Sequence, residues 1–338
     1  MKHRIHQGST ADPGVSRRAI LQASAGALAF GTGAPALAQG TWPQKAVTLI
    51  VPFPAGGGTD VTARATARIL SEALGQQVVV ENRAGAAGAI GTEAGARAAP
   101  DGYTLVFGTT GTHTVNQTLY PKLGYDPVAS FEPVSLVCRY NNVLVTHPSV
   151  PANDFAAFLS EVRSHPGKYF YAISVNGSSG HLAMELLKSE AKLQIQGVPY
   201  KGAAEAMNDF MSGRVPLMCD TVINQLQNIK AGKVKAIATT GPQRSPALPD
   251  VPTVAEGGLA GFQAVGWAGV FAPKGTPQAV VDRLSQELRK SVQSPHYEGL
   301  ARSGLELVAS TPEETRAFVA SETEKWRKLI RTAGIVAS

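Results

Sequence analysis

The chain has 338 residues, enough for two domains of ordinary size. Its hydrophobic fraction of 43% and charged fraction of 17% exclude an intrinsically disordered chain and indicate a globular protein with a sizeable core. The formal net charge is only +6, and no run of lysines and arginines with interleaved aromatic residues occurs, which argues against a nucleic-acid-binding protein.

Residues 1–38 read as an export signal. A twin-arginine-like stretch, SRRAIL, contains Arg17 and Arg18 and opens a run rich in alanine and glycine. The run closes with an A-x-A cleavage pattern that ends at Ala38. A membrane anchor is disfavoured, because the run is weakly apolar and is interrupted by glycines and Pro35. We therefore expect cleavage near Ala38 and a mature chain in the periplasm, with the export route left open.

Short strands and helices alternate along the rest of the chain. Apolar, β-branched segments predict strands, and segments with helical periodicity predict helices. The expected strands are residues 47–51, 78–80, 103–107, 169–175, 215–218 and 234–239, with a short strand end at Val198. The expected helices are residues 61–74, 88–99, 155–163, 181–191, 203–212, 277–292 and 312–333. This alternation indicates an α/β fold with largely parallel sheets.

Two stretches rich in proline and glycine divide this pattern. They lie around residues 145–148 and 241–266, and we interpret them as crossings between two α/β lobes. We assign residues 39–142 and 262–338 to lobe 1 and residues 143–261 to lobe 2, so that the C-terminal helices return to the first lobe.

Cys138 and Cys219 are the two cysteines of the chain. An oxidising compartment permits a disulfide between them. However, they fall in different predicted lobes and lack metal-ligand spacing, so we expect two buried free thiols and no metal site.

The stretch PFPAGGGTD, residues 52–60, joins a predicted strand to a predicted helix. In an open parallel sheet, ligands bind at the carboxyl ends of strands. The first N–H groups of a helix have no partner within it, and the helix dipole favours a negative ligand. Three glycines would let a ligand approach this backbone, so the stretch predicts an anion cradle; the alternative is a purely structural turn. A nucleotide loop is excluded, because no G-x-x-x-x-G-K-[ST] motif occurs.

A second stretch, NGSSGH at residues 176–181, also follows a predicted strand and opens a helix. A serine hydrolase is disfavoured, because G-x-S-x-G is absent and no acidic residue is placed to support His181 as a base. His181 is alternatively a packing residue at the helix start. Two helix N-termini across a cleft would suit a small molecule with two carboxylates, or with one carboxylate and a polar end.

Ordered stretches through nearly all of the mature chain match one known family. They are WPQKAVTLIVPFPAGGGTD, VVVENRAGAAGAIG, APDGYTLVFGTTG, LYPKLGYDPVASFEPVSLV, NGSSGHLAMELL, VPYKGAAEAMNDFMSGRVPLM, LPDVPTVAEGG and GVFAPKGTP. With them the sequence resembles the Bug-type solute receptors, the extracytoplasmic substrate-binding proteins of tripartite tricarboxylate transporters. The resemblance implies a two-lobed periplasmic binding protein fold of the type II-like class. Each lobe would be a mostly parallel sheet flanked by helices, with a ligand cleft between the lobes and no catalysis.

The resemblance also implies which residues meet the ligand. The loop from Phe53 to Asp60 would hold one carboxylate through backbone groups, often with ordered water. Residues after the third strand would line the same side, and the second lobe would supply the rest. The predicted ligand-binding residues are Phe53, Ala55, Gly56, Gly57, Gly58, Thr59, Asp60, Thr109, Thr110, Ser178, Ser179, His181, Tyr200, Asp220 and Thr221.

One wall departs from the family pattern. The stretch CDTVINQLQ differs from the commoner forms, so ligand choice there stays open. Asp220 would receive an amino group, which favours an amino acid over a plain dicarboxylate, or would cap a helix instead. Tyr200 would pack under the ligand or belong to the core.

These features together predict a periplasmic solute-binding receptor. It would capture a small carboxylate (dicarboxylate, tricarboxylate or amino acid) by flytrap closure and deliver it to a tripartite tricarboxylate-type membrane carrier. The alternative is a ligand-sensing receptor that docks on the ectodomain of a sensor kinase, which would use the same closed state. An exported hydrolase is the disfavoured third reading. We predict no catalytic residue, cofactor or nucleic-acid partner.

Overall fold

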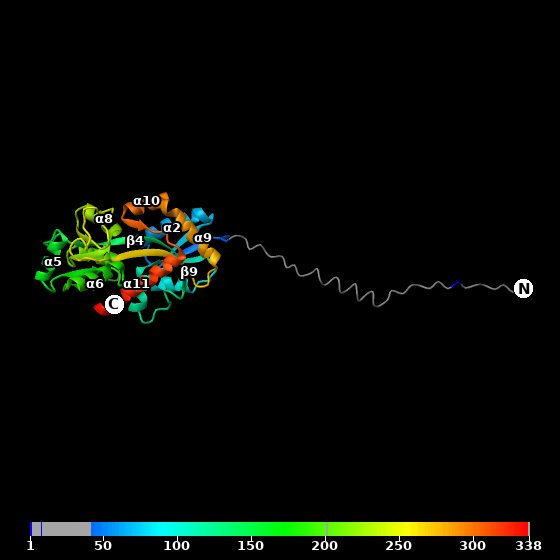
Figure 1. Ribbon diagram of the computed structural model, residues 1–338, viewed down its shortest axis with the longest axis horizontal. Helices are drawn as coiled ribbons and strands as arrows, with labels where there is room; N and C mark the ends of the chain where they lie inside the picture. Colours follow the sequence, from blue (N-terminus) through cyan, green and yellow to red (C-terminus); the bar gives the residue numbers. More distant parts are fainter. Residues whose placement is uncertain (2–7, 9–41, 201, 337–338) are drawn as a thin grey trace. The chain divides into compact units, whose positions relative to one another are not determined.

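The computed structural model describes residues 1, 8, 42–200 and 202–336. The chain divides into residues 1–42 and a compact unit of residues 43–338, and only the second is described below (Figure 1). The predicted export signal with its cleavage site near Ala38 lies outside the described residues, apart from Met1 and Gly8. No helix among the described residues has the length and apolarity needed to cross a bilayer.

The strands of the compact unit form one continuous sheet. Its order is β2-β1-β3-β9-β4-β7-β5-β6, and β8 and β10 each pair with β4. The strands are β1 (Val47–Val51), β2 (Val78–Asn82), β3 (Thr104–Thr109), β4 (Phe131–Thr146), β5 (Phe170–Ile173), β6 (Gln196–Pro199), β7 (Leu217–Thr221), β8 (Lys235–Thr239), β9 (Val265–Pro273) and β10 (Leu305–Leu307).

The long strand β4 divides this sheet into two halves. Its residues up to Asn141 pair with β9, and from Asn142 onward it pairs with β7 and β8. We call the strands β1, β2, β3, β9 and β10 the β1 half, and the strands β5 to β8 the β5 half. The change of partners falls beside the predicted lobe boundary at residue 142, although the lobe assignment itself remains a prediction.

Parallel pairing is confined to the outer strands of both halves. Strand β1 pairs parallel with β2 and β3, and β5 pairs parallel with β6 and β7. In contrast, β4 and β9 are antiparallel to all their partners. The predicted parallel sheets are therefore present at the outer edges, and an antiparallel core of two long strands, which the sequence analysis did not identify, joins them.

Helices cover both halves. In Figure 1, α5, α6 and α8 lie at the end of the sheet opposite to α2 and α9. The α-helices are α2 (Gly58–Leu74), α3 (Ala89–Ala96), α4 (Asn116–Leu119), α5 (Phe155–Ser164), α6 (Ser179–Ala191), α7 (Ala203–Met211), α8 (Val222–Lys230), α9 (Gln278–Lys290), α10 (Pro295–Arg302) and α11 (Pro312–Ala333). Three short turns of helix are η1 (Ala86–Gly88), η2 (Gly111–Val115) and η3 (Ser291–Gln293).

The last helix, α11, has the bounds predicted for it. Thr311 forms a capping box with Glu314, Pro312 occupies the first turn, and Gly334 ends the helix in the left-handed conformation. Its first part contributes Val319 to the hydrophobic cluster of the β1 half, and its later part contributes Trp326 to that of the β5 half. Helix α11 therefore packs against both halves of the sheet.

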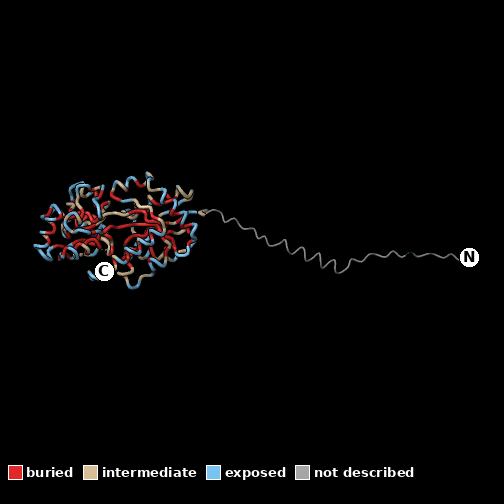
Figure 2. The backbone as a smooth tube through the Cα atoms, in the orientation of Figure 1, coloured by how far each residue is buried: buried red, intermediate tan, exposed pale blue. Residues whose placement is uncertain are grey.

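Buried residues follow the central strands, and exposed residues lie on the loops and outer helices (Figure 2). All nine residues of β9 are buried. Cys138 and Cys219 are both buried and free, which confirms the expectation of unpaired thiols. Burial also raises the pKa of the Cys138 thiol to about 12, so that it is an unreactive core group.

Removal of the largest α11 side chain should destabilise the whole unit. Trp326 is fully buried, and its indole N–H donates to Glu322 Oε2 at 2.9 Å. We expect Trp326→Ala to lower the free energy of unfolding by about 3–5 kcal/mol, through lost burial and the cavity left behind. Chemical denaturation measures this loss. Lys328→Ala, an exposed change on the same helix, is the control and should stay within about 0.5 kcal/mol of the parent. An equally small effect of Trp326→Ala would contradict the packing of α11 described above.

Candidate ligand-binding site

Loops at the strand ends of both halves enclose a cavity of about 580 Å³. This volume is within the range of small-molecule sites. The β1 half contributes residues 53–59, 87 and 109–111, β4 contributes Tyr140, and the β5 half contributes residues 174–180, 202–204, 220, 221 and 224.

Four helices begin at this cavity. The N-cap residues of α2, α6, α7 and α8 are Gly57, Ser178, Gly202 and Thr221, and all four line it. The described lining residues include no lysine or arginine. Each helix start adds unpaired N–H groups and the positive end of a dipole, so the cavity attracts an anion without a cationic side chain among these residues.

The side chain of Asp60 holds the glycine loop before α2 through a hydrogen bond to its backbone. Gly56 has a φ of 87°, and its N–H donates to Asp60 Oδ2 at 2.9 Å. The same carboxylate accepts hydrogen bonds from Arg64 Nε and Asn82 Nδ2, each at 2.9 Å. Burial opposes ionisation of Asp60, but these hydrogen bonds outweigh it and lower its pKa. Asp60 therefore orients the loop rather than lining the cavity.

The loop before α6 uses the same arrangement with a different side chain. Gly177 has a φ of 75°, and its N–H donates to His181 Nδ1 at 3.0 Å. His181 follows Gly177 by four residues, as Asp60 follows Gly56. The imidazole must accept at Nδ1, so it is neutral and carries its proton on Nε2. Burial lowers the pKa of His181 to about 4, which keeps it in this form.

Two serines at the start of α6 have different partners. Ser178 is the N-cap, and its hydroxyl accepts from the His181 N–H at 3.3 Å. Ser179 donates to Asn142 Oδ1 at 2.9 Å. On the opposite side of the cavity, Thr110 Oγ1 accepts from the Trp267 N–H at 3.0 Å. These hydroxyl groups are thus fixed by the protein before any ligand enters.

The end of β7 carries an acidic side chain in the cavity wall. Asp220 accepts from the Thr221 N–H at 2.7 Å, from Asn224 Nδ2 at 3.2 Å and from Gln225 Nε2 at 3.4 Å. Burial raises the pKa of Asp220 despite these donors. The cap of α8 is Thr221, whose hydroxyl accepts from the Asn224 N–H at 3.4 Å. Asp220 is therefore not the helix cap that the sequence left as an alternative.

Most of the predicted site residues meet at the cavity. Those that line it are Phe53, Ala55, Gly56, Gly57, Gly58, Thr59, Thr109, Thr110, Ser178, Ser179, Asp220 and Thr221. Asp60 and His181 instead hold the loops. Tyr200 lies outside the lining, and its hydroxyl donates to Asp209 Oδ2 at 2.8 Å.

Several lining residues were not predicted from the sequence. Tyr140 belongs to β4, which was not predicted. Asn224 lies on α8, a helix that the sequence offered only as an alternative role for Asp220. Residues 202–204 form the start of α7, a predicted helix whose N-terminus was not considered as a ligand-binding feature. The Gly202 before a helical pattern was the available signal there.

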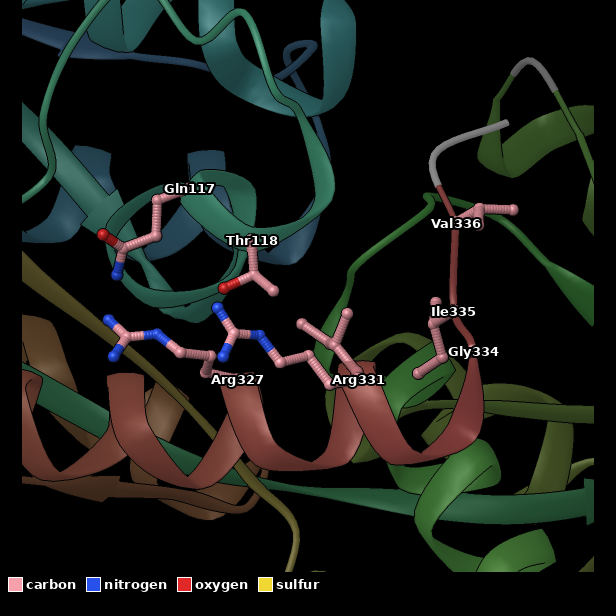
Figure 3. Close-up of a pocket in the computed structure, with 8 residues that line it drawn as sticks. Gln117, Thr118, Arg327, Arg331, Gly334, Ile335 and Val336 are labelled. Atoms are coloured by element: carbon pink, nitrogen blue, oxygen red, sulfur yellow. The ribbon is translucent and has the colours of Figure 1, made fainter.

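A smaller hollow of about 350 Å³ lies between α4 and the end of α11. Figure 3 shows Arg327 and Arg331 pointing from α11 toward Gln117 and Thr118. Arg327 already pairs with Glu324, and Arg331 is exposed. The hollow adjoins the main site, because Asn176 Nδ2 donates to the carbonyl of Val336 at 3.3 Å. The larger cavity, where four helices begin, is the better candidate for a ligand.

Comparison with known proteins gives consistent matches. The model of the tripartite tricarboxylate transporter family receptor matches residues 62–335. An R. palustris protein solved with adipate is 38% identical to this chain, with a TM-score of 0.82. The match covers 87% of this chain and 99% of the R. palustris chain. The periplasmic binding protein BugD is 38% identical, with a TM-score of 0.79 and coverage of 88% and 100%. MatC from Rhodopseudomonas palustris with bound malate is 36% identical, with a TM-score of 0.77 and coverage of 86% and 100%. These similarities confirm the predicted fold class.

Loss of the Asp60 carboxylate should loosen the glycine loop. Asp60→Ala leaves the Gly56 N–H, Arg64 and Asn82 without their acceptor, so we expect a loss of about 1–3 kcal/mol in the free energy of unfolding. Asp60→Asn keeps one oxygen for Gly56 and should lose less. Denaturation of both variants tests this order, and equal stability of Asp60→Ala and the parent would contradict it.

The neutral state of His181 should make stability depend on pH. Between pH 6.5 and its folded pKa of about 4, the unfolded chain binds a proton that the folded chain does not. Stability is therefore lost as the pH falls through this window. For His181→Gln, the loss between pH 7 and pH 4 should be smaller by up to roughly 3 kcal/mol. His113, with a pKa lowered by burial to about 3, contributes in the same direction and is unchanged in this variant. Parallel curves for parent and variant would contradict the assignment.

Proposed function

The chain belongs to the tripartite tricarboxylate transporter family of receptors, and we propose that it captures a small carboxylate by flytrap closure and delivers it to a membrane carrier of that transporter class. The family match and the similarity to BugD confirm the resemblance seen in the sequence. The family is one of periplasmic solute-binding receptors, not of enzymes.

The convergence of four helix N-termini on one cavity supports a carboxylate ligand. Each terminus acts as about half a positive charge, so four together exceed the charge of one carboxylate. The cap positions Gly57 and Gly202 carry no side chain that hydrogen-bonds the helix start. The N–H groups behind them are therefore available to an oxygen anion, directly or through water.

Close approach of the two halves at glycines supports flytrap closure. A Cβ at Gly58 of α2 would lie 3.1 Å from Ile223 Cγ2 of α8. A Cβ at Gly111 would lie 3.5 Å from the carbonyl oxygen of Gly177. Both pairs join the β1 half to the β5 half beside the cavity. Small residues at these positions let the loops meet over a ligand.

The proposed ligand class can be tested on the purified mature protein. Native mass spectrometry first identifies a retained ligand, and a thermal-shift panel then compares C4–C6 dicarboxylates, tricarboxylates, acidic and neutral amino acids and pyridine carboxylates. A ligand at a hundredfold excess over its dissociation constant should stabilise the fold by about 2.7 kcal/mol. No retained carboxylate in the mass spectrum and no response to any acid of the panel would contradict the proposal.

Delivery to a carrier is tested separately. Membrane extracts are passed over the immobilised receptor with and without the ligand found in the panel. Ligand-dependent recovery of carrier subunits would support delivery, whereas recovery of a sensor kinase alone would favour the signalling role that the sequence left open.

The backbone cradle can be tested by removal of one N–H group. Gly58 is the first residue of α2, where proline is compatible with a helix, and Gly57 before it is extended. Gly58→Pro therefore deletes one donor and should weaken carboxylate binding about tenfold. Gly58→Ala is the matched control, since it adds a Cβ near Ile223 but keeps the N–H. Equal affinity of the two variants in calorimetry would show that this N–H does not contact the ligand.

A further inference from the structure

The hydroxyl hydrogen of Ser179 is not available to a ligand. Ser179 lines the cavity and donates to Asn142 Oδ1 at 2.9 Å. Asn142 is fully buried at the point where β4 changes partners between the two halves. A hydroxyl group has one hydrogen, so Ser179 can offer only lone pairs to the cavity.

The orientation of the Asn142 amide is determined by its other neighbours. Its Nδ2 donates to the carbonyl of Ala264 at 3.3 Å, and Thr240 Oγ1 donates to the same carbonyl at 2.7 Å. A flipped amide would place Oδ1 against the Ala264 oxygen, so Oδ1 must face Ser179. Thr240 also accepts from the Asn142 N–H at 3.0 Å, which holds the residue from its backbone.

Two further side chains with oxygen lone pairs line the same cavity as Ser179. They are Tyr140, whose hydroxyl oxygen can accept a hydrogen bond, and Asp220. Asp220 lies close enough to Tyr140 to interact with it electrostatically, and its own oxygens face the donors of Thr221, Asn224 and Gln225. We call Ser179, Tyr140 and Asp220 the acceptor patch. It offers lone pairs and negative charge, whereas the start of α2 offers N–H groups.

We propose that Asn142 is a positioning residue that determines specificity: by holding the Ser179 hydrogen, it makes this wall select carboxylates that also carry a hydrogen-bond donor, a hydroxyl or an ammonium group. This inference rests on the proposed function. The ligand would place a carboxylate at the start of α2 and its donor at the acceptor patch. An unsubstituted dicarboxylate has no hydrogen atom to donate to the acceptor patch, so the lone pairs of the patch stay unmatched when it binds.

Calorimetry with matched ligands tests the proposal. Two series of three acids are compared, and within each series the acids share one carbon skeleton and differ only in the substituent on the second carbon. The first series is succinate, malate and aspartate. The second is adipate, 2-hydroxyadipate and 2-aminoadipate. We expect a substituted member to bind at least about tenfold tighter than its parent acid. Equal or tighter binding of the parent acid overturns the inference and leaves the proposed function intact. If neither these six compounds nor any acid of the panel binds, the proposed function fails, and the inference fails with it.

Variants test whether Asn142 acts through Ser179. Asn142→Leu releases the serine hydrogen, so the preference for the substituted ligand over its parent should fall about tenfold. If Asn142→Leu does not fold, Ser179→Ala serves as the second variant. It removes the hydroxyl acceptor and should therefore reduce the same affinity ratio. The matched control is Asn141→Leu, because Asn141 donates away from the cavity to the carbonyl of Gln243 and should leave the ratio unchanged. Equal weakening of all ligands by Asn142→Leu and Ser179→Ala would indicate a merely structural role and overturn the proposal.

Asp220→Asn separates the two kinds of donor. Loss of the carboxylate charge should weaken the amino compounds about tenfold more than the hydroxy compounds, if an ammonium group meets the patch. If a hydroxyl group meets it, the hydroxy compounds should keep their advantage over the parent acid. An equal loss for the parent and both substituted acids would exclude Asp220 from the patch.

Discussion

A helix cannot satisfy its own first N–H groups, and this constraint governs the arrangement at the centre of the molecule. Four helices begin at one cavity, and two of them start at glycines without a capping side chain. Their free donors require a partner from outside the helix. The loops that present these donors are held by a carboxylate in one half and an imidazole in the other, Asp60 and His181. Equivalent backbone geometry has thus been reached with unrelated side chains.

The two halves share more than a cleft. Strand β4 belongs to both. Asn142 of β4 is hydrogen-bonded to Ser179 at the start of α6, to Thr240 after β8 and to Ala264 just before β9. Helix α11 adds core residues to each side. Motion of one half against the other would therefore have to bend β4 and α11. Strand β4 also contributes Tyr140 to the cavity wall.

Local signals explain which features the sequence predicted. The β-branched run of β1, the glycines before α2 and the capping box of α11 each depend on neighbouring residues, so they were identified with the correct order and nearly the correct bounds. Strand β9 is buried on both faces and contains Gly266 and Gly269, so its sequence lacks the alternation of apolar and polar residues that indicates a strand. Strand β4 contains Pro133 and a polar segment at Arg139–Asn142, whose burial depends on distant partners. Tyr140 and the Asn142–Ser179 pair were missed for this reason, since only the fold brings β4 to α6.

The contact between the segment after α11 and a loop of the cavity has a consequence for how the protein is prepared. Asn176, which lines the cavity, donates a hydrogen bond to the carbonyl of Val336, just after the end of α11. Removal of the residues that follow α11, or insertion of an affinity tag directly after this helix, would thus alter the support of a loop that lines the cavity. Binding measured on a protein with a tag at this position would report on the tag as well as on the receptor.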